Sequence, residues 1–347
     1  MKCTCGGASY LSSADYAAQA NGAHMSCEHC DQSIHYGPAV AALRDPQDPA
    51  LGEVSTFAWY HTSTSPDWPS LEYAKRFADG LTWVDRTFGS TRENFIAEQT
   101  SKALHLGTYE TAIENMLRRM KNQGDGGSQF YLFRVALGGD PLRINKGYRD
   151  ENHEVAADLT LSDLDSDGLD LVRYLNVHEA MGVLSIAVRR DVIAGVQSIP
   201  VPLEAPADTG DAELFRNEVE TVARAAHELI DAQSSAASIE PRQLRAMQLG
   251  MKPDPTGVAE AVGRAQHEVY DSWYRLEGRL GELLLPNVSA TIRDDFNYAM
   301  AHWRDDRSMA GVVEFVRRYE AMSALLENSD DIIATLAAQP WRAVAAA

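Results

Sequence analysis

Four cysteines lie in the first thirty residues of this 347-residue chain, and their spacing is that of a metal site. Cys3 and Cys5 are separated by one residue, Cys27 and Cys30 by two, and 21 residues stand between the pairs. Zinc takes four ligands in a tetrahedron, and a Cys-x-x-Cys turn delivers two thiolates at once. We therefore predict a structural zinc site, with four metal-free thiols or a disulfide-linked module as the alternatives.

The sequence around the second cysteine pair resembles that of a zinc ribbon. Ile34, His35 and Tyr36 follow the pair and favour a β-hairpin, while His24 and His29 are spare ligands that could replace one cysteine. A closed site of four protein ligands is structural, so this predicted module, residues 1–50, is expected to shape a recognition surface.

Three strings farther along the chain place polar side chains at the ends of predicted strands: WYHTS at 59–63, LHLGTYETAIENM at 104–116 and YLNVHEAMGVLS at 174–185. His61 ends an aromatic strand, Gly107 and Thr108 form a turn before a helix, and Glu179 follows a polar turn. One histidine, one aromatic residue and one glutamate on separate segments could form a small polar site.

The order of these strings resembles the ADP-ribosyltransferase superfamily. Its first motif, a histidine followed by Gly or Thr and then Ser or Thr, is similar to His61-Thr62-Ser63. Its second motif, an aromatic-containing strand that runs into a helix, is similar to residues 104–116, and Glu179 is the candidate for its third-motif glutamate. Thr62 stands where the eukaryotic polymerases of the superfamily have glycine. The resemblance covers roughly residues 54–195 and neither flank.

The resemblance implies transfer of ADP-ribose from NAD to a macromolecular acceptor, protein or nucleic acid. A carboxylate stabilises the oxocarbenium-like transition state of this reaction more than the ground state, and the resemblance gives that role to Glu179. It implies that two clusters of residues bind NAD: His61, Thr62 and Ser63, and His105, Gly107, Thr108 and Tyr109. In the second cluster, either His105 or Tyr109 packs on the nicotinamide ring. Members with small accessory domains are often bacterial or phage toxins or defence effectors.

Each of these residues also has a purely structural interpretation. His61 can be a hydrogen-bonded structural histidine, Thr108 a helix cap and Glu179 a solvated loop acid. The alternative functions are a non-catalytic zinc-ribbon adaptor, which predicts zinc but no NAD binding, and an NAD glycohydrolase, which releases nicotinamide without labelling an acceptor. A phosphotransferase-like member of the same fold is a third.

The elements that must position these residues indicate an α+β protein. Aromatic and β-branched runs predict strands at 57–63, 129–137 and 182–189, and helical spacing predicts helices at 90–103 and from Ile113 to Met120. We expect residues 51–200 to form the ADP-ribosyltransferase-like domain, a split β-sheet with helices. A linker at 201–210 precedes a helical bundle at 211–347, for which oligomerisation or partner binding is the expected role. Its predicted helices span 214–232, 258–285, 290–304 and 309–327.

Composition limits the function classes. The 31 basic and 50 acidic residues give a formal charge of −19, which disfavours non-specific coating of nucleic acid. We find neither an apolar leader nor a stretch of about 18 apolar residues, so we expect a cytoplasmic protein with no membrane partner.

Four charged or aromatic patterns have simpler interpretations. DLDSDG at 163–168 begins like a calcium loop, but the twelfth position falls on Tyr174, so we interpret it as an acidic turn. Glu110 and Glu114 are expected to stabilise the start of their helix. Arg118, Arg119 and Lys121 are expected to complement that helix's C-terminus or to bind the phosphates of NAD or a nucleic-acid target. Helical spacing assigns the aromatic residues of the C-terminal third to the core: Trp273, Tyr274, Phe296, Tyr298, Trp303, Phe315 and Tyr319.

Overall fold

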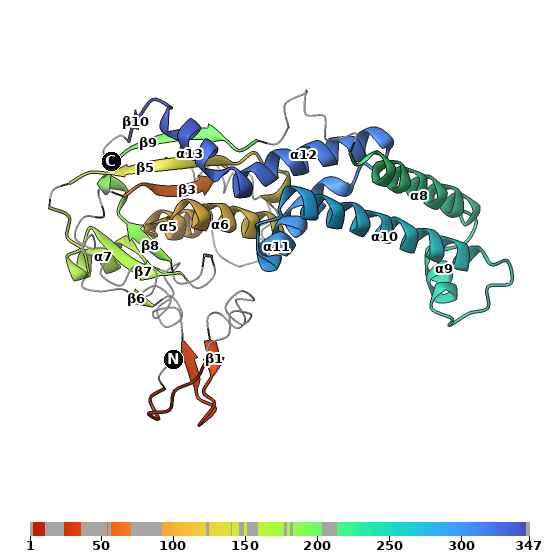
Figure 1. The fold of residues 1–347 in the computed structure, drawn as a ribbon, viewed down its shortest axis with the longest axis horizontal. Coiled ribbons are helices and arrows are strands. Elements are labelled where there is room, and N and C mark those ends of the chain that lie inside the picture. Colours follow the sequence, from red (N-terminus) through yellow and green to blue (C-terminus); the bar gives the residue numbers. More distant parts are fainter. Residues whose placement is uncertain are drawn as a thin grey trace. The chain divides into compact units, whose positions relative to one another are not determined.

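The fold mixes helices and sheets and ends in a largely helical region, as the sequence predicts (Figure 1). The computed structural model describes residues 3–10, 24–35, 54, 57–70, 92–122, 125–139, 141–145, 149–150, 159–176, 179–180, 183–202 and 214–344. The chain divides into two compact units, which are described separately: Met1–Val201 with Ser289–Ile292 and Asp330–Ala347, and Pro202–Val288 with Arg293–Ser329.

The cysteine-rich segment contains a short antiparallel hairpin. Strand β1 (His24–Ser26) pairs with β2 (Ser33–His35), so that Met25 lies opposite Ile34. The hairpin predicted from Ile34 and His35 is therefore present, and Tyr36 lies outside the described residues. The turn between the two strands carries Cys27 and Cys30.

One four-stranded sheet of the first unit is antiparallel throughout, in the order β10-β9-β5-β3. It contains β3 (Trp59–Ser63), β5 (Tyr131–Leu137), β9 (Ile193–Pro200) and β10 (Arg342–Ala343). The predicted runs at 57–63 and 129–137 form β3 and β5. Strand β9, which has no aromatic residue, was not predicted.

A second four-stranded sheet has the order β4-β8-β7-β6. It contains β4 (Leu104–Leu106), β8 (Leu184–Val188), β7 (Leu171–Leu175) and, pairing in parallel with β7, β6 (Arg149–Asp150). Backbone hydrogen bonds between Tyr60 and Gly107 join the two sheets where β3 and β4 meet. Side chains from both sheets pack into one apolar core, which includes Trp59, Leu106, Phe133, Ile186 and Val196.

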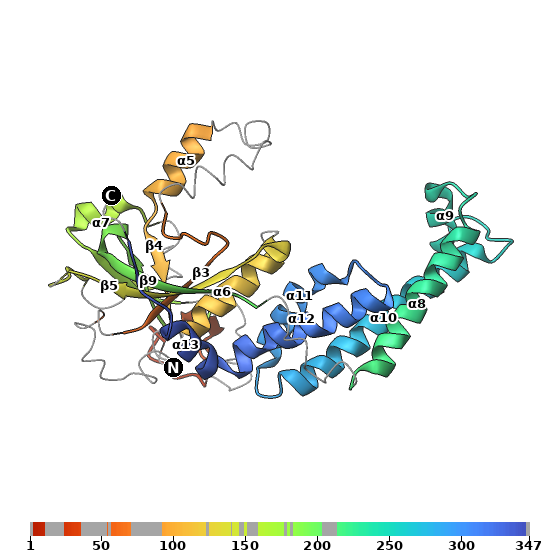
Figure 2. The same cartoon turned by 90° about the horizontal axis from the view of Figure 1, so that it is seen from above.

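Helices flank the sheets of the first unit (Figure 2). They are α5 (Arg92–Ser101), α6 (Tyr109–Asn122), α7 (Leu161–Asp167) and α13 (Ser329–Ala337), with 3-10 turns at Asp125–Gly127 and Arg190–Val192. The interpretation of DLDSDG as an acidic turn was wrong, because most of it lies in α7. Thr160 and Asp163 form a reciprocal capping box there, and Gly168 ends the helix in the left-handed conformation.

The second unit contains the predicted long helices. They are α8 (Arg216–Ser235), α9 (Pro241–Gln248), α10 (Val258–Leu284), α11 (Ala290–Met300), the 3-10 turn Ala301–Arg304 and α12 (Met309–Glu327); α9 was not predicted. Helices α8 and α10 lie side by side in both views (Figures 1 and 2). Of the aromatic residues assigned to the core from the sequence, Trp273, Phe296, Phe315 and Tyr319 are buried, but Tyr274 and Tyr298 are exposed. Helical spacing does not separate the aromatic residues that pack against a neighbouring helix from those at the edge of the apolar face, which remain exposed.

The end of the chain differs from the predicted boundaries. Residues 330–347 were assigned to the helical bundle, but they belong to the first unit because β10 adds an edge strand to β9. The Gln197 side chain of β9 donates hydrogen bonds to the carbonyls of Ala337 and Gln339, which fixes the return. Most of the predicted linker at 201–210 lies outside the described residues. In the described part of the chain, none of the helices is long and apolar enough to cross a bilayer.

Candidate active site

Strand β3 separates the three polar residues of the first motif onto two faces, as the two-residue period of a strand requires. His61 and Ser63 line a cavity, whereas Thr62 is buried on the opposite face, where its hydroxyl donates to the carbonyl of Ala112 at 3.0 Å. The His61 ring is stacked on Trp68, with ring centroids 4.2 Å apart and planes at 20°. Thr62 therefore anchors α6 to the sheet, and His61 and Ser63 remain for a ligand.

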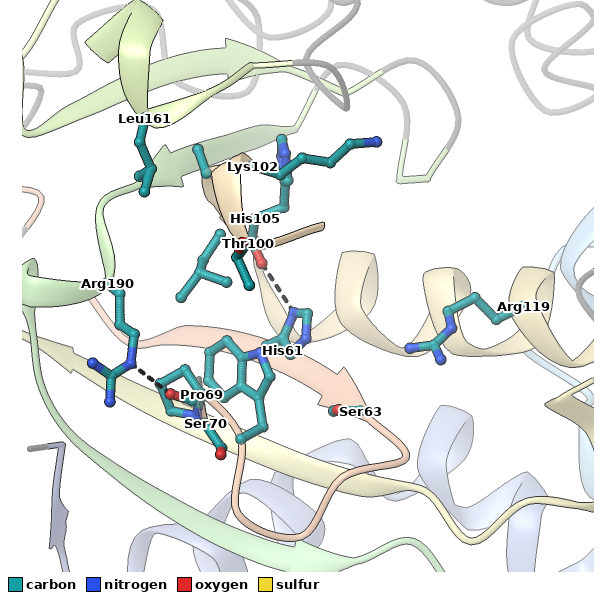
Figure 3. Close-up of a pocket in the computed structure, with 13 residues that line it drawn as sticks. His61, Ser63, Pro69, Ser70, Thr100, Lys102, His105, Arg119, Leu161 and Arg190 are labelled. Atoms are coloured by element: carbon teal, nitrogen blue, oxygen red, sulfur yellow. Dashed lines mark hydrogen bonds between the residues drawn. The ribbon is translucent and has the colours of Figure 1, made fainter. Parts of the chain in front are cut away.

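His61 and His105 come together where β3 and β4 meet. The Nδ1 atom of His61 lies 2.9 Å from the carbonyl oxygen of His105, which assigns its proton to Nδ1 (Figure 3). The His105 ring makes its own contact, Nδ1 to the Tyr174 hydroxyl at 3.1 Å, and its Nε2 atom is buried with no hydrogen-bond partner among the described residues.

Both histidines are held neutral by their surroundings. Burial lowers the pKa of His61 to about 3, and the positive charge of Arg119 adds to this effect. Burial likewise lowers the pKa of His105 to about 4, with a smaller contribution from Lys102. Each ring can therefore donate one hydrogen bond and accept another without carrying charge at neutral pH.

The cavity that these histidines line has a volume of about 300 Å³, at the lower end of the range of small-molecule sites. Among the described residues its wall contains three cationic side chains, Lys102, Arg119 and Arg190, and no acidic one. The chain carries a formal charge of −19, so a purely cationic lining is a local exception. Such a lining favours an anionic ligand such as a phosphate.

Two of these arginines are fixed in different ways. Arg119 forms a bidentate contact with Asp125, 2.6 and 3.1 Å from its Oδ2, and the planar group lies over the Phe130 ring. Arg190 donates through Nε to the carbonyl of Pro69 at 2.7 Å (Figure 3), and its buried Nη1 atom has no hydrogen-bond partner in the described part of the chain. Arg190 is thus held at the cavity wall by the Pro69 carbonyl, while the charge of Arg119 is partly neutralised by Asp125.

The C-terminal return supports the same wall. Arg342 of β10 donates to the carbonyl of Trp68 at 2.6 Å, next to the Pro69 carbonyl that Arg190 holds. Trp68 in turn stacks on His61. Arg342, near the C-terminus, therefore helps to fix the tryptophan that stacks on the first-motif histidine.

The second motif divides between the cavity and the core. His105 lines the cavity, but Tyr109 is buried edge-on against Tyr60, with ring centroids 5.7 Å apart. Burial raises the pKa of Tyr109, so its hydroxyl keeps its proton. Of the two candidates for stacking on a ligand, the geometry favours His105.

Gly107 and Thr108 have structural contacts. The Gly107 amide donates to the Tyr60 carbonyl at 3.0 Å, so it is not one of the free backbone amides expected from the sequence. A Cβ atom at Gly107 would lie 2.7 Å from Thr111 Cγ2 and 2.9 Å from Ser185 Oγ, which explains why glycine stands there. The Thr108 hydroxyl accepts from the amide of Thr111, three residues on, at 3.4 Å, a helix-cap contact.

Glu179 lies outside the cavity lining and is buried rather than solvated, so its interpretation as a solvated loop acid was wrong. Its Oε1 atom accepts from the Asn115 side chain at 3.0 Å and lies 2.5 Å from Arg118. Arg118 and Arg119 are consecutive on α6, so they point about 100° apart around the helix. Helix α6 therefore contacts Glu179 through one residue and the cavity through the next.

The loop that carries Glu179 is tied to α6 at two further points. Glu114 accepts a hydrogen bond from the Ala180 amide at 2.6 Å, so its role extends beyond the helix-end effect expected from the sequence. The buried Asn176 side chain donates to the hydroxyls of Thr111 and Ser185, at 3.2 and 2.6 Å. His178, beside Glu179, lies outside the described residues.

Comparisons with models of protein families, with curated proteins and with solved structures return no match for this chain. Assignment of a function therefore depends on the chemistry of the cavity and of its neighbours. The sequence motifs identified His61, Ser63 and His105, and the basic patch included Arg119. Trp68, Lys102 and Arg190 were missed, because nothing local in the sequence indicates that their segments converge.

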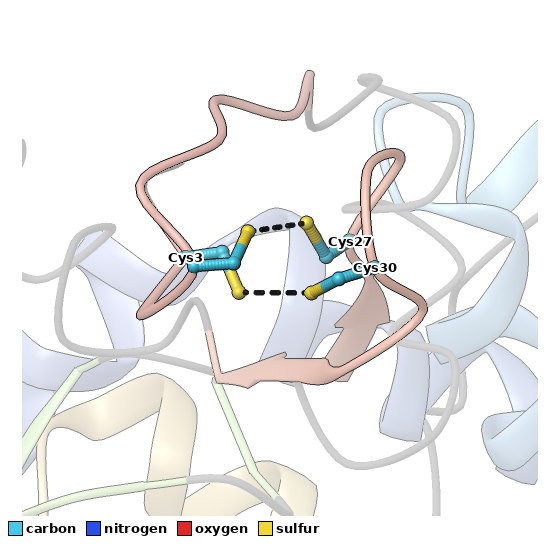
Figure 4. Close-up of side chains that lie close together, drawn as sticks. Cys3, Cys27 and Cys30 are labelled. Carbon is cyan, nitrogen blue, oxygen red and sulfur yellow. Dashed lines mark hydrogen bonds between the residues drawn. The ribbon is translucent and has the colours of Figure 1, made fainter.

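The four cysteines form a second candidate site. Their Sγ atoms lie within 4.8 Å of one another, with Cys3–Cys30 and Cys5–Cys27 separations of 3.6 and 3.7 Å (Figure 4). A tetrahedron with Zn–S bonds of about 2.3 Å has edges of about 3.8 Å, whereas a disulfide requires about 2.05 Å. The described cysteines are free thiols, and the cluster could hold a metal such as zinc.

The backbone around the cluster favours thiolate at Cys27. The amides of Gly7 and His29 each point at a sulfur, Cys5 and Cys27 respectively, at 3.4 Å. The contact from His29 contributes most to lowering the pKa of Cys27, which falls to about 6. The His29 ring, a spare ligand in the sequence, instead lies 2.9 Å from the Ala8 carbonyl through Nε2.

Proposed function

We propose that the cavity between β3 and β4 binds NAD and that the protein transfers ADP-ribose to a macromolecular acceptor. One observation carries the proposal: His61 and His105, which are far apart in the sequence, meet at one cavity with cationic walls. Neutral histidines suit the ribose hydroxyls of a dinucleotide, and Arg190 with Lys102 suits its pyrophosphate. The first-motif Ser63 lies in the same wall.

The reaction breaks the bond between the ribose C1′ and the nicotinamide nitrogen. A nucleophilic oxygen or nitrogen of the acceptor forms the new bond to C1′ and loses its proton, while nicotinamide leaves with the bonding electron pair. We assign to Glu179 the stabilisation of the positive charge that develops on the ribose. Glu179 lies outside the cavity lining, so its ion pair with Arg118 must open and its loop must move for the carboxylate to reach the ribose.

The same ion pair favours a second candidate function, binding without turnover. A Glu179 that stays bound to Asn115 and Arg118 would leave a nucleotide-binding adaptor, in which the zinc module and helices recruit partners. If water is the acceptor, the protein is instead an NAD glycohydrolase. These outcomes differ in nicotinamide release and in label transfer.

The test uses the full zinc-loaded chain with NAD labelled in the adenylate and separate pools of protein, RNA and DNA. We expect label in one pool, and a loss of at least a hundredfold in Glu179→Gln, the scale seen when a transition-state contact is removed. Glu110→Gln is the matched control, because Glu110 is an exposed acid on α6, the helix that holds the Glu179 loop. Nicotinamide release without labelled acceptor would indicate the glycohydrolase, and no release with intact NAD binding would indicate the adaptor.

We further propose that Cys3, Cys5, Cys27 and Cys30 bind one structural zinc ion. Metal analysis of the purified chain should give one zinc per molecule, and a chelator should abolish the NMR signals of the β1–β2 hairpin while those of β5 persist. A hairpin that survives removal of the metal would contradict the structural role.

A further inference from the structure

The short helix α9 and the turn that follows it form a distinct surface of the helical unit. In both views α9 lies at one end of the α8–α10 pair, away from α12 (Figures 1 and 2). We refer to residues 241–253, which comprise α9 and this turn, as the α9 tip. All of them belong to the second compact unit.

The α9 tip is basic in a chain whose formal charge is −19. It contains Arg242, Arg245 and Lys252 and no acidic residue, and Glu240 borders it. The three basic side chains are exposed, and none of them forms an ion pair within the described part of the chain. Exposed arginines of α8 and α10, in contrast, pair with glutamates of their own helix: Arg224 with Glu228, Arg264 with Glu260, Arg275 with Glu268 and Arg279 with Glu282. The charge of the α9 tip is therefore available to a partner.

Two large apolar side chains of the α9 tip are also in solvent. Leu249 is 57% exposed and Met251 is 75% exposed. They stand on either side of Gly250, whose φ of 69° lies in the left-handed region and ends the helix. The Met251 amide donates to the Ala246 carbonyl at 2.8 Å. Both apolar side chains are thus held at a hydrogen-bonded corner.

One face of α9 combines the charged and the apolar side chains. Arg242, Arg245 and Leu249 follow one another at three and four residues, the spacing that places side chains on one face of a helix. Gln248 lies on the side that meets α10, with its Nε2 atom 3.4 Å from Oε1 of Gln266. Helix α9 therefore packs on α10 through one side and presents arginine and leucine on another.

This combination favours a lipid surface over the other anionic partners. In a bilayer interface, exposed apolar side chains enter the boundary of the acyl chains while basic groups stay at anionic headgroups. A single-stranded nucleic acid stacks its bases on aromatic side chains, and the α9 tip has none. A protein groove that receives a helix requires a stripe of apolar anchors, but Arg242 and Arg245 occupy those positions on the free face.

We propose that the α9 tip docks on an anionic lipid bilayer, with Leu249 and Met251 in the interface and the three basic side chains at the headgroups. The contact is peripheral and reversible, because two side chains bury too little apolar surface for a stable anchor. The sequence-based expectation of no membrane partner rested on the lack of a long apolar stretch, which a peripheral contact does not require. The docking is independent of the activity proposed for the β3–β4 cavity.

The experiment is co-sedimentation of the full chain with two kinds of vesicle, phosphatidylcholine alone and phosphatidylcholine mixed equally with phosphatidylglycerol. We expect binding to the anionic vesicles that is at least tenfold tighter than binding to the neutral ones, since three basic residues contribute. High salt should weaken it. Absence of binding to the anionic vesicles, or equal binding to both kinds, would overturn the proposal.

Variants locate the contact on the α9 tip. The double change Leu249→Ser and Met251→Ser should weaken binding at least tenfold, and Arg245→Gln about fivefold. The matched controls are Leu283→Ser and Arg279→Gln, which change an exposed leucine and an exposed arginine of α10 outside the tip. Both should bind as the wild type does, and equal losses in tip and control variants would overturn the site. Binding of duplex DNA or RNA that the tip variants lose, without binding to vesicles, would assign the tip to nucleic acid instead.

Discussion

At the scale of single residues, the cavity depends on two histidines that burial keeps neutral. A neutral His61 fixes its tautomer by donating to the His105 carbonyl, which leaves Nε2 as an acceptor. His105 has a buried Nε2 with no partner among the described residues. These rings are therefore suited to hydroxyl groups of a ligand, while the guanidinium of Arg190 suits its negative charge.

The lowered pKa values predict sensitivity to acid. The unfolded chain takes up protons at His61 and His105 near pH 6.5, whereas the folded chain does so only near pH 3 to 4. Their contribution to stability is thus complete above pH 6.5 and is lost as the pH falls toward the folded-state pKa values. Urea midpoints measured from pH 7.5 to 4.5 should fall less steeply in His61→Gln than in the wild type.

The control for this prediction is His227→Gln, which changes an exposed histidine of α8. Its midpoints should follow the wild-type curve. An NMR titration that placed the His61 ring near pH 6.5 in the folded chain would contradict the account of its burial.

At the scale of elements, helix α6 organises the candidate site. Its N-terminal end meets the β3–β4 junction through Tyr109, which packs against Tyr60; its middle holds the Glu179 loop, and Arg119 near its end reaches the cavity. A shift of α6 would therefore change the positions of Glu179 and of the cavity wall together.

We predict that Asn176→Ala destabilises the first unit by about 1–3 kcal/mol, because it removes a buried donor to the hydroxyls of Thr111 and Ser185. It should also release the Glu179 loop from α6, which hydrogen exchange at Ala180 would detect. Asn217→Ala, at an exposed position of α8, is the control and should change stability by less than about 0.5 kcal/mol. Unchanged exchange at Ala180 would show that the loop is held independently of Asn176.

The elements with strong local signals were predicted, and those that depend on distant partners were not. Aromatic strands such as β3 and β5 and amphipathic helices such as α10 carry their own periodicity. Strand β10 contains two residues and exists because β9 offers an open edge, which only the folded chain shows. The same limit applies to Trp68 and Arg190, whose role at the cavity follows from tertiary contacts.

At the scale of the whole molecule, the chain leaves the first unit for the helices and then returns to it. The return places β10 on β9, and Trp341 lies under the Arg134 guanidinium, 5.6 Å from ring centroid to Cζ. Because Arg342 also holds the Trp68 carbonyl, the last described residues of the chain contribute to the candidate site. The helical region is thus an insertion between the sheet and its edge strand.

Deletion of residues 340–347 should therefore lower the stability of the first unit by about 2 kcal/mol, since several hydrogen bonds of about 1 kcal/mol are lost. It should also weaken the Trp68–His61 stack, which would appear as a changed His61 ring shift in NMR spectra. Arg342→Ala should give part of both effects, and Arg317→Ala, an exposed charge on α12, should give neither. A deletion with wild-type stability would contradict a role for the return.

The most direct test of the central claim is equilibrium binding of NAD to the full zinc-loaded chain, measured by isothermal titration. We predict saturable binding at one site, weakened about tenfold or more in His61→Ala and in Arg190→Gln, since each removes a polar contact at the cavity. Arg317→Gln should bind as the wild type does. Absence of NAD binding by the folded chain, or binding that neither cavity variant alters, would contradict the assignment of the β3–β4 cavity.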